Sequence, residues 1–175
     1  LIRFVRGYAA KVEHVKIKRQ FAMKLLLPAL VTNEEALIRF EREAEVLASL
    51  RHPNIVTITD WDYLPDGSPF MILEFLHGAH LRKRLDRGPL PWDAIARIGD
   101  QAMAALQLAH RVGVTHRDLK PENIYISIHD AGDERVKLLD FGVSKLHRVG
   151  RTTGKHSLLG TPSYMSPEQA EGLSD

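Results

Sequence analysis

Three polar side chains at the two ends of a short hairpin restrict the fold of this chain more than any other feature of its sequence. Asp118 and Asn123 lie five residues apart, and Asp140 directly follows an apolar stretch. Two apolar stretches around a turn sequence predict a β-hairpin over 124–139. The fold must therefore place a carboxylate that can accept a proton near two side chains whose oxygen atoms can bind a hard cation.

A lysine and a glutamate occupy positions in the first half where apolar side chains are expected. Lys24 interrupts the apolar run 21–27, and Glu43 falls on the apolar face of a helix predicted over 33–50. Because burial of either charge alone costs free energy, the sequence predicts that the two side chains pair. The alternative is that both reach solvent at the edge of a small core.

The first 76 residues are predicted to be mostly strands with a single helix. Alternating apolar and charged residues indicate the strands, which are expected within 8–27, 55–63 and 69–75. Thr32 followed by Glu35 is a capping-box pattern, so Thr32 is expected to cap the helix over 33–50.

The second half is predicted to be richer in helix. A short helix is expected between Leu81 and Gly88, and a long one over 92–112. The inward face of the long helix is expected to carry Ile95, Ile98, Ala102, Ala105, Leu106 and Ala109. The stretch 143–160 has no periodicity, which is typical of a long functional or disordered loop.

Composition excludes several classes of protein. The 24 basic and 22 acidic residues nearly balance and form no dense basic block, which argues against nucleic-acid binding. Cysteine is absent, the nine histidines show no supported metal-ligand spacing, and no apolar run is long enough to cross a bilayer. We therefore expect a cytoplasmic protein without a membrane segment in this chain; the sequence leaves its oligomeric state open.

In combination and order, these motifs resemble a eukaryotic-type (Hanks-type) serine/threonine protein kinase domain of the kind found in bacteria. The matching segments are 21–24, Glu43, 116–123, 140–142 and 160–168. The resemblance implies a two-lobed α+β kinase-like fold, with a β-rich N-lobe containing one helix and an incomplete helical C-lobe. It divides the chain into an N-lobe at 1–73, a hinge at 74–78 and part of a C-lobe at 79–175.

The resemblance also implies a role for each site residue. The catalytic residues would be Asp118 as the base, Lys120 and Asn123; Asn123 and Asp140 would bind Mg²⁺. ATP would be bound by Lys24, Glu43, Gly7, Ala9, Ala22, Tyr125 and the backbone of Glu74 and Leu76. Leu47, Ile58, Phe141 and His116 would stack as an apolar column, for which ordinary core packing is the alternative.

Regulation by phosphorylation is a further implication. Arg117 would bind a phosphorylated activation segment. The candidate sites are Thr152, Thr153 and Ser157, with Thr161 near the end of the segment. The alternative is that these are ordinary solvated hydroxyls.

The sequence departs from the family pattern at the nucleotide site and at its C-terminal end. Gly7 occupies the place of the third glycine of the phosphate-covering loop, but Ile2 and Phe4 occupy the first two. Ala9 replaces a valine, and Tyr125 replaces a leucine-like residue beneath the adenine. The family has further helices after residue 168, so part of the helix over 92–112 is expected to be exposed.

The predicted function is transfer of the γ-phosphoryl group of Mg-ATP to serine or threonine hydroxyls of proteins. The departures from the pattern keep open an alternative, a catalytically impaired pseudokinase or gene fragment that acts, if at all, by binding proteins. A small-molecule phosphotransferase of related fold is disfavoured by the segment 160–168, which those enzymes lack.

Overall fold

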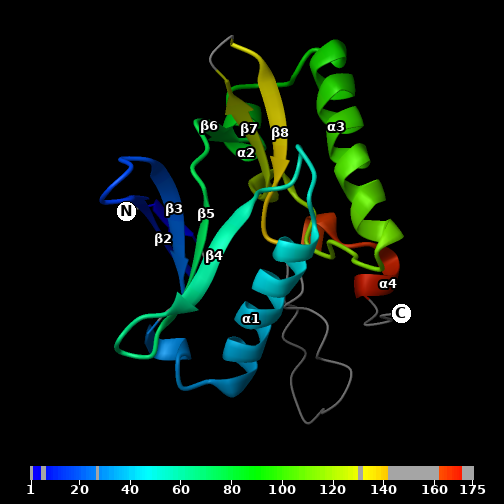
Figure 1. Cartoon of the computed structure of the whole chain (residues 1–175). Helices are drawn as coiled ribbons and strands as arrows, with labels where there is room; N and C mark the ends of the chain where they lie inside the picture. Colours follow the sequence, from blue (N-terminus) through cyan, green and yellow to red (C-terminus); the bar gives the residue numbers. More distant parts are fainter. Residues whose placement is uncertain (1, 5–6, 27, 130–131, 142–161, 171–175) are drawn as a thin grey trace.

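The chain forms an antiparallel sheet with one helix, followed by a smaller sheet with the remaining helices (Figure 1). This computed structural model describes residues 2–4, 7–26, 28–129, 132–141 and 162–170. The first sheet has five strands in the order β1-β2-β3-β5-β4, and the second has three in the order β6-β7-β8. This α+β architecture agrees with the predicted fold class.

The elements of the first part are β1 (Ile2–Phe4), β2 (Gly7–Glu13), β3 (Gln20–Leu25), a 3₁₀ turn η1 (Pro28–Leu30), α1 (Glu34–Ser49), β4 (Ile58–Tyr63) and β5 (Pro69–Glu74). Those of the second part are β6 (Gly78–His80), α2 (Leu81–Leu85), α3 (Trp92–Arg111), η2 (Pro121–Asn123), β7 (Ile124–Ile128), β8 (Glu134–Leu138), η4 (Pro162–Tyr164) and α4 (Pro167–Ala170).

The N-terminal cap of α1 differs from the predicted one. Asn33, in extended conformation, is the cap, and its side-chain oxygen accepts a hydrogen bond from the Ala36 backbone N–H at 2.9 Å. Thr32 lies one residue too early, so its predicted role was wrong. The helix prediction itself is confirmed within one residue at each end, because the apolar positions that face the sheet set its length.

The strand predicted from residue 55 begins three residues later. Ile58 starts β4, whereas Ile55 forms an isolated parallel bridge with Leu138 of β8. The Val56 N–H donates to the Leu138 carbonyl at 3.0 Å, and the Leu138 N–H donates to the Asn54 carbonyl at 2.8 Å. The segment before β4 therefore joins the two sheets instead of extending the first.

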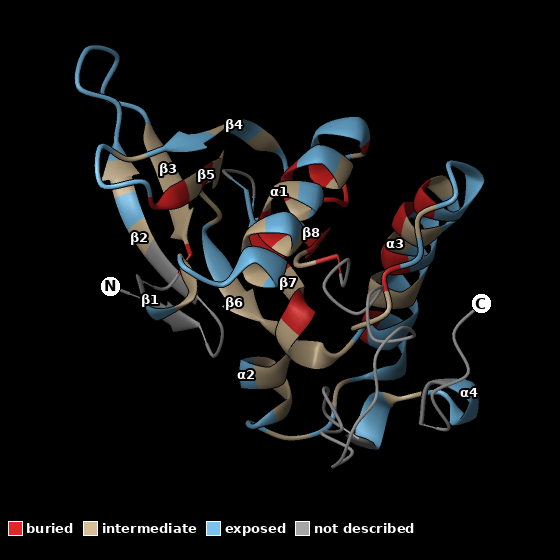
Figure 2. Cartoon of the chain, turned by 90° about the horizontal axis from the view of Figure 1, so that it is seen from below, coloured by how far each residue is buried: buried red, intermediate tan, exposed pale blue. Residues whose placement is uncertain are grey.

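The long helix α3 buries a stripe of small residues against the second sheet (Figure 2). Its buried residues are Ala94, Ala102, Ala105 and Ala109. The prediction for Ile95 was wrong: its side chain is 44% exposed, because Ala94 and not Ile95 is in phase with the stripe. Met103 is 60% exposed, so part of the helix surface is apolar and uncovered, as expected.

Two clusters of buried side chains support the site. One lies between α3, β7, β8 and the end of α1, with Phe141 and Leu138 almost fully buried. The other lies between α1 and β5, around Phe40 and Met71. Among the described residues, no helix is long and apolar enough to cross a membrane.

Candidate active site

Lys24 joins three elements that are far apart in sequence. Its Nζ lies 2.6 Å from Oε1 of Glu43, on α1, and 2.8 Å from Oδ1 of Asp140, which follows β8. The predicted pairing of Lys24 with Glu43 is thus confirmed. The contact with Asp140 adds a link between the first sheet and the end of the second.

The three charges shift one another's titration. Burial alone would lower the pKa of Lys24, but the carboxylates of Asp140 and Glu43 raise it above its ordinary value. Burial raises the pKa of Glu43 despite the attraction of Lys24. Burial also opposes ionisation of Asp140, yet the Lys24 ammonium holds the pKa of that carboxyl below its ordinary value. Asp140 is therefore an anion at neutral pH.

A second polar group surrounds Asp118. Lys120 Nζ donates to Asp118 Oδ2 at 3.0 Å. The amide nitrogen of Asn123 donates to the Asp118 carbonyl at 2.8 Å and to its Oδ2 at 3.1 Å. Since the nitrogen of the Asn123 amide is used in this way, its oxygen is left as an acceptor. The structure thus brings together the three predicted catalytic residues.

His116 fixes the segment that carries Asp118. Its ring lies 4.6 Å from the Phe141 ring between centroids, and its Nε2 lies 3.0 Å from the Leu139 carbonyl oxygen. The side chain is buried, which lowers the pKa of His116 and keeps the imidazole neutral. Leu47, Phe141 and the partly buried Ile58 belong to one apolar cluster, which both the predicted column and ordinary core packing would produce.

The backbone is strained at two points of this site. Arg117 has a φ of 57° and Asp140 a φ of 46°, in the left-handed region that residues other than glycine rarely adopt. Such strain persists only where the surrounding structure enforces it, and it is concentrated at functional sites. Of the two strained residues, Arg117 directly precedes Asp118, and Asp140 contacts Lys24.

The predicted adenine-binding residues lie around the end of β5. Ala22 is paired with Leu73 across β3 and β5, and Ala9 is paired with Lys24 across β2 and β3. The Tyr125 hydroxyl donates to the Leu76 carbonyl at 3.3 Å. Tyr125 therefore reaches the backbone that was predicted to bind adenine.

The structure also gives the positions of Gly7 and Glu74, two further residues predicted to bind ATP. Gly7, at the start of β2, pairs with Phe4 of β1. The Glu74 backbone N–H donates to the Thr57 carbonyl at 2.9 Å, so this N–H is not available to adenine. Of the predicted regulatory residues only Arg117 is described; Thr152, Thr153, Ser157 and Thr161 lie outside the described ranges.

Sequence reasoning missed Lys137, a second lysine buried in an apolar strand. Its Nζ lies 2.6 Å from Glu74 Oε1 and 3.3 Å from the Ile55 carbonyl. The same Glu74 oxygen accepts from the Thr57 backbone N–H at 2.8 Å. This pair joins β8 to the end of β5. Lys137 could have been found in the sequence as a lone lysine in the apolar stretch 136–139. The same kind of pattern identified Lys24.

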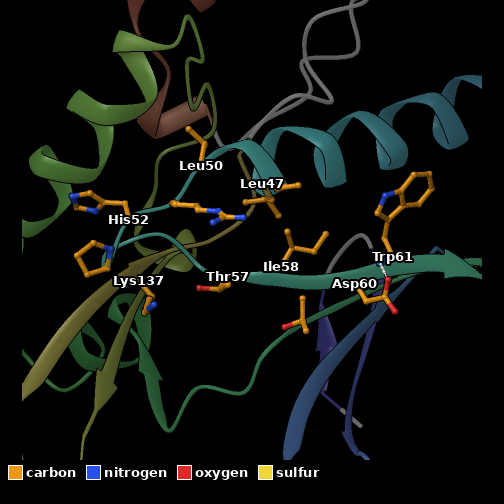
Figure 3. Close-up of a pocket in the computed structure, with 12 residues that line it drawn as sticks. Leu47, Leu50, His52, Thr57, Ile58, Asp60, Trp61 and Lys137 are labelled. Carbon is orange, nitrogen blue, oxygen red and sulfur yellow. Dashed lines mark hydrogen bonds between the residues drawn. The ribbon is translucent and has the colours of Figure 1, made fainter.

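Sequence reasoning also missed a hollow of about 730 Å³, which Leu47 and Ile58 of the predicted column help to line (Figure 3). It lies beside the end of α1 and the start of β4, and its lining includes Leu50, His52, Trp61 and Lys137. None of the residues predicted to bind nucleotide lines it. The described part of the chain contains no group of three His, Cys, Asp or Glu side chains that could hold a metal.

The family model described as "Protein kinase domain" matches residues 5–173. The chain belongs to the protein kinase domain family. Among its curated relatives are serine/threonine-protein kinase pkn3 of Myxococcus xanthus, 36% identical over 171 residues, and serine/threonine-protein kinase PknL of Mycobacterium tuberculosis, 39% identical over 157 residues. These alignments cover 95% and 89% of this kinase domain chain.

Solved structures give the same result for the fold. A mutant of the M. tuberculosis PknI kinase domain aligns with all of this chain with a TM-score of 0.73 and 30% identity. This kinase chain spans 64% of that structure, 31% of pkn3 and 38% of PknL.

Proposed function

We propose that this chain is the part of a serine/threonine protein kinase that binds Mg-ATP and transfers its γ-phosphoryl group to serine or threonine hydroxyls of proteins. The contact of Lys24 with both Glu43 and Asp140 carries this proposal, because it connects the predicted phosphate-binding and metal-binding residues. The two relatives are named as serine/threonine-protein kinases, which supports the same reaction class.

In this proposal Asp118 orients the substrate hydroxyl and accepts its proton. Lys120, 3.0 Å from Asp118 Oδ2, supplies a positive charge beside the transferred group. The Lys24 ammonium binds the α- and β-phosphates. The backbone at Glu74 and Leu76 binds the adenine, with Tyr125 beneath it and Gly7, Ala9 and Ala22 above.

The residues present fit a magnesium ion. Asp140 contributes a carboxylate and Asn123 an amide oxygen, and Mg²⁺ in such sites takes its remaining ligands from phosphates and water. When bound, the ion neutralises the charge of the phosphates during transfer. The strained backbone at Asp140 limits the directions in which its carboxylate can point.

The proposal extends to domain limits, regulation and location. We place the N-lobe at 1–73, the hinge at 74–78 and the C-lobe residues at 79–175. Arg117 lies next to Asp118 and would bind a phosphorylated activation segment, with Thr152, Thr153, Ser157 and Thr161 as candidate sites. A reaction that consumes ATP is consistent with the cytoplasm.

The test measures transfer of radiolabelled γ-phosphate from ATP to a generic protein substrate. We expect transfer that requires Mg²⁺ and that Asp118→Asn reduces at least a hundredfold, since general-base catalysis contributes about that factor. Asp93→Asn, an exposed carboxylate on α3, is the matched control and should retain activity. Transfer that is absent, or equal in the Asp118→Asn variant, would leave a protein-binding role instead.

A further inference from the structure

Helix α2 and the residues after it carry an unusual concentration of positive charge. Arg82, Lys83, Arg84 and Arg87 fall within six residues, with Asp86 as the only acidic residue among them. In the whole chain basic and acidic residues nearly balance. This local excess is therefore not a consequence of general composition, and the proposed function has not used it.

The position of α2 brings this charge to the catalytic residues. The helix packs against η2, which contains Asn123, and against β6 and β7 (Figure 1). Asn123 in turn donates to Asp118. α2 therefore lies beside the loop that carries the catalytic residues, and a protein segment bound at Asp118 can extend to it.

Arg82 connects α2 to a second part of the site. Its guanidinium contacts Asp86 at 2.8 Å, and both the Asp86 carboxylate and, more weakly, the Tyr164 side chain raise the pKa of Arg82. Tyr164 lies in η4, within the segment 160–168 that resembles the end of an activation segment. The side chain of Arg82 thus lies between α2 and that segment.

Two of the four cations are available to bind another molecule. Arg82 pairs with Asp86, and Arg84 pairs with Glu134 at 2.6 Å. Lys83 and Arg87 are exposed and form no ion pair with any residue that the structure describes. They are free to contact anions without breaking an existing pair.

We propose that Lys83 and Arg87 bind an acidic segment of the protein substrate, with Arg82, which keeps its pair with Asp86, beside them. These three residues are here called the α2 basic surface. This inference rests on the proposed function and names its substrate class: proteins whose target serine or threonine lies near Asp, Glu or phosphorylated residues. The surface selects such proteins by charge complementarity, which raises the rate of association and orients the segment.

The size of the surface favours a short peptide segment over other polyanions. Nucleic acids are bound by longer tracks of cations, commonly with aromatic side chains that stack on bases. The α2 basic surface offers three cations on little more than one helical turn. Two or three carboxylates on an extended peptide match this extent.

One carboxylate near α2 would favour a basic rather than an acidic substrate segment. Glu122, in η2, has a buried carboxylate oxygen without a hydrogen-bond partner in the structure. A basic substrate residue would be attracted by Glu122 and repelled by the α2 basic surface. The comparison of acidic with basic peptides therefore decides between the two groups.

The experiment uses the full 175-residue chain with three peptides that differ only in the residues around one serine, which are Glu, Ala or Arg. At low ionic strength we expect kcat/KM for the Glu peptide to exceed that for the Ala peptide at least fivefold. Lys83→Glu with Arg87→Glu should reduce this ratio about tenfold, and added salt should reduce it in the unmodified chain. A preference for the Arg peptide, or an equal ratio in the variant, would overturn the proposal.

The matched control is Lys16→Glu with Lys18→Glu, which changes the net charge equally at the exposed turn between β2 and β3. Its ratio should equal that of the unmodified chain; an equal fall in both variants would mean that only net charge matters, and would overturn the proposal.

A binding measurement separates failure of this inference from failure of the proposed function. A fluorescent Glu peptide with alanine in place of serine is titrated with each protein and followed by anisotropy. If no peptide is phosphorylated in an Asp118-dependent manner, the proposed function fails. Weaker binding of the Glu peptide by Lys83→Glu with Arg87→Glu than by the control variant would still support the docking surface, and equal binding would overturn it.

Discussion

The Lys24 ammonium lies 2.8 Å from the Asp140 carboxylate, the group that we propose to bind Mg²⁺. A protein cation thus occupies one oxygen of the metal ligand before any ion arrives. Glu43 contacts the same ammonium at 2.6 Å, so two carboxylates converge on one positive charge. Removal of that charge should leave an anionic site open to divalent ions.

Lys24→Met should therefore have opposite effects on metal and nucleotide. Affinity for Mn²⁺ alone, measured by electron paramagnetic resonance, should rise about fivefold to tenfold because a competing cation is removed. Affinity for ATP should fall, because the phosphates lose their lysine. In the Lys24→Met background, Asp140→Asn should abolish the gain; a gain that persists would place the metal elsewhere.

Tyr125 provides a test of the nucleotide site. Its hydroxyl donates to the Leu76 carbonyl at 3.3 Å, where the adenine is expected. Tyr125→Leu restores the residue type of the family pattern and removes this contact, so we expect ATP to bind about threefold to tenfold more tightly by fluorescence titration. Tyr125→Phe removes only the hydroxyl and separates the contribution of the hydrogen bond from that of the ring. Weaker binding by Tyr125→Leu would show that the tyrosine contributes to the site.

Much of this site could be predicted because single residues broke a local pattern. Lys24 and Glu43 were recognisable as charges on apolar faces, and their pairing follows from the free energy of burying an unpaired charge. Asp118 and Asn123 were recognisable because they are five residues apart, a spacing at which a short turn can bring both side chains to one point. Each of these residues was recognised from the sequence immediately around it.

The errors and omissions arose where distant contacts decide the structure. Ile55 was assigned to a strand of the first sheet, but Leu138, more than eighty residues away, pairs with it instead. The side chain of Ile95 is exposed because the surface of the second sheet selects Ala94. The hydroxyl contact of Tyr125 depends on how the end of β5 passes β7, which no local pattern encodes.

The Glu74–Lys137 pair should contribute to stability more than exposed pairs do. The Lys137 side chain is only 7% exposed, so Glu74→Gln leaves an ammonium group with little water and one carbonyl contact. We expect the free energy of unfolding in urea to fall by about 2 kcal/mol.

Two comparisons identify the cause of that loss. Lys137→Met combined with Glu74→Gln should recover much of the stability, because no unpaired charge remains. Asp93→Asn breaks the exposed pair with Arg97 on α3 and should lower the free energy of unfolding far less. Equal losses for Glu74→Gln and Asp93→Asn would show that burial of Lys137 is unimportant.

His116 should make stability depend on pH between about 7 and 5. Burial lowers the pKa of His116 in the folded chain below the value of about 6.5 expected when unfolded, even though Asp118 and Asp140 act in the opposite direction. As the pH falls through 6.5 the unfolded chain takes up a proton that the folded chain does not, so the free energy of unfolding decreases. Loss of stability through Asp140, whose pKa is lowered, begins only near pH 4.

His116→Phe removes this titration but keeps a ring beside Phe141. The melting temperature of the variant at pH 7 should be lower, because the contact with the Leu139 carbonyl is lost. Between pH 7 and pH 5, the melting temperature of the variant should nevertheless fall by less than that of the unmodified chain. His52, whose pKa is lowered by burial and by Arg111 and Lys137, contributes to the slope that remains. Equal slopes in both proteins would mean that His116 has the same pKa in the folded and unfolded chains, so that burial does not lower it.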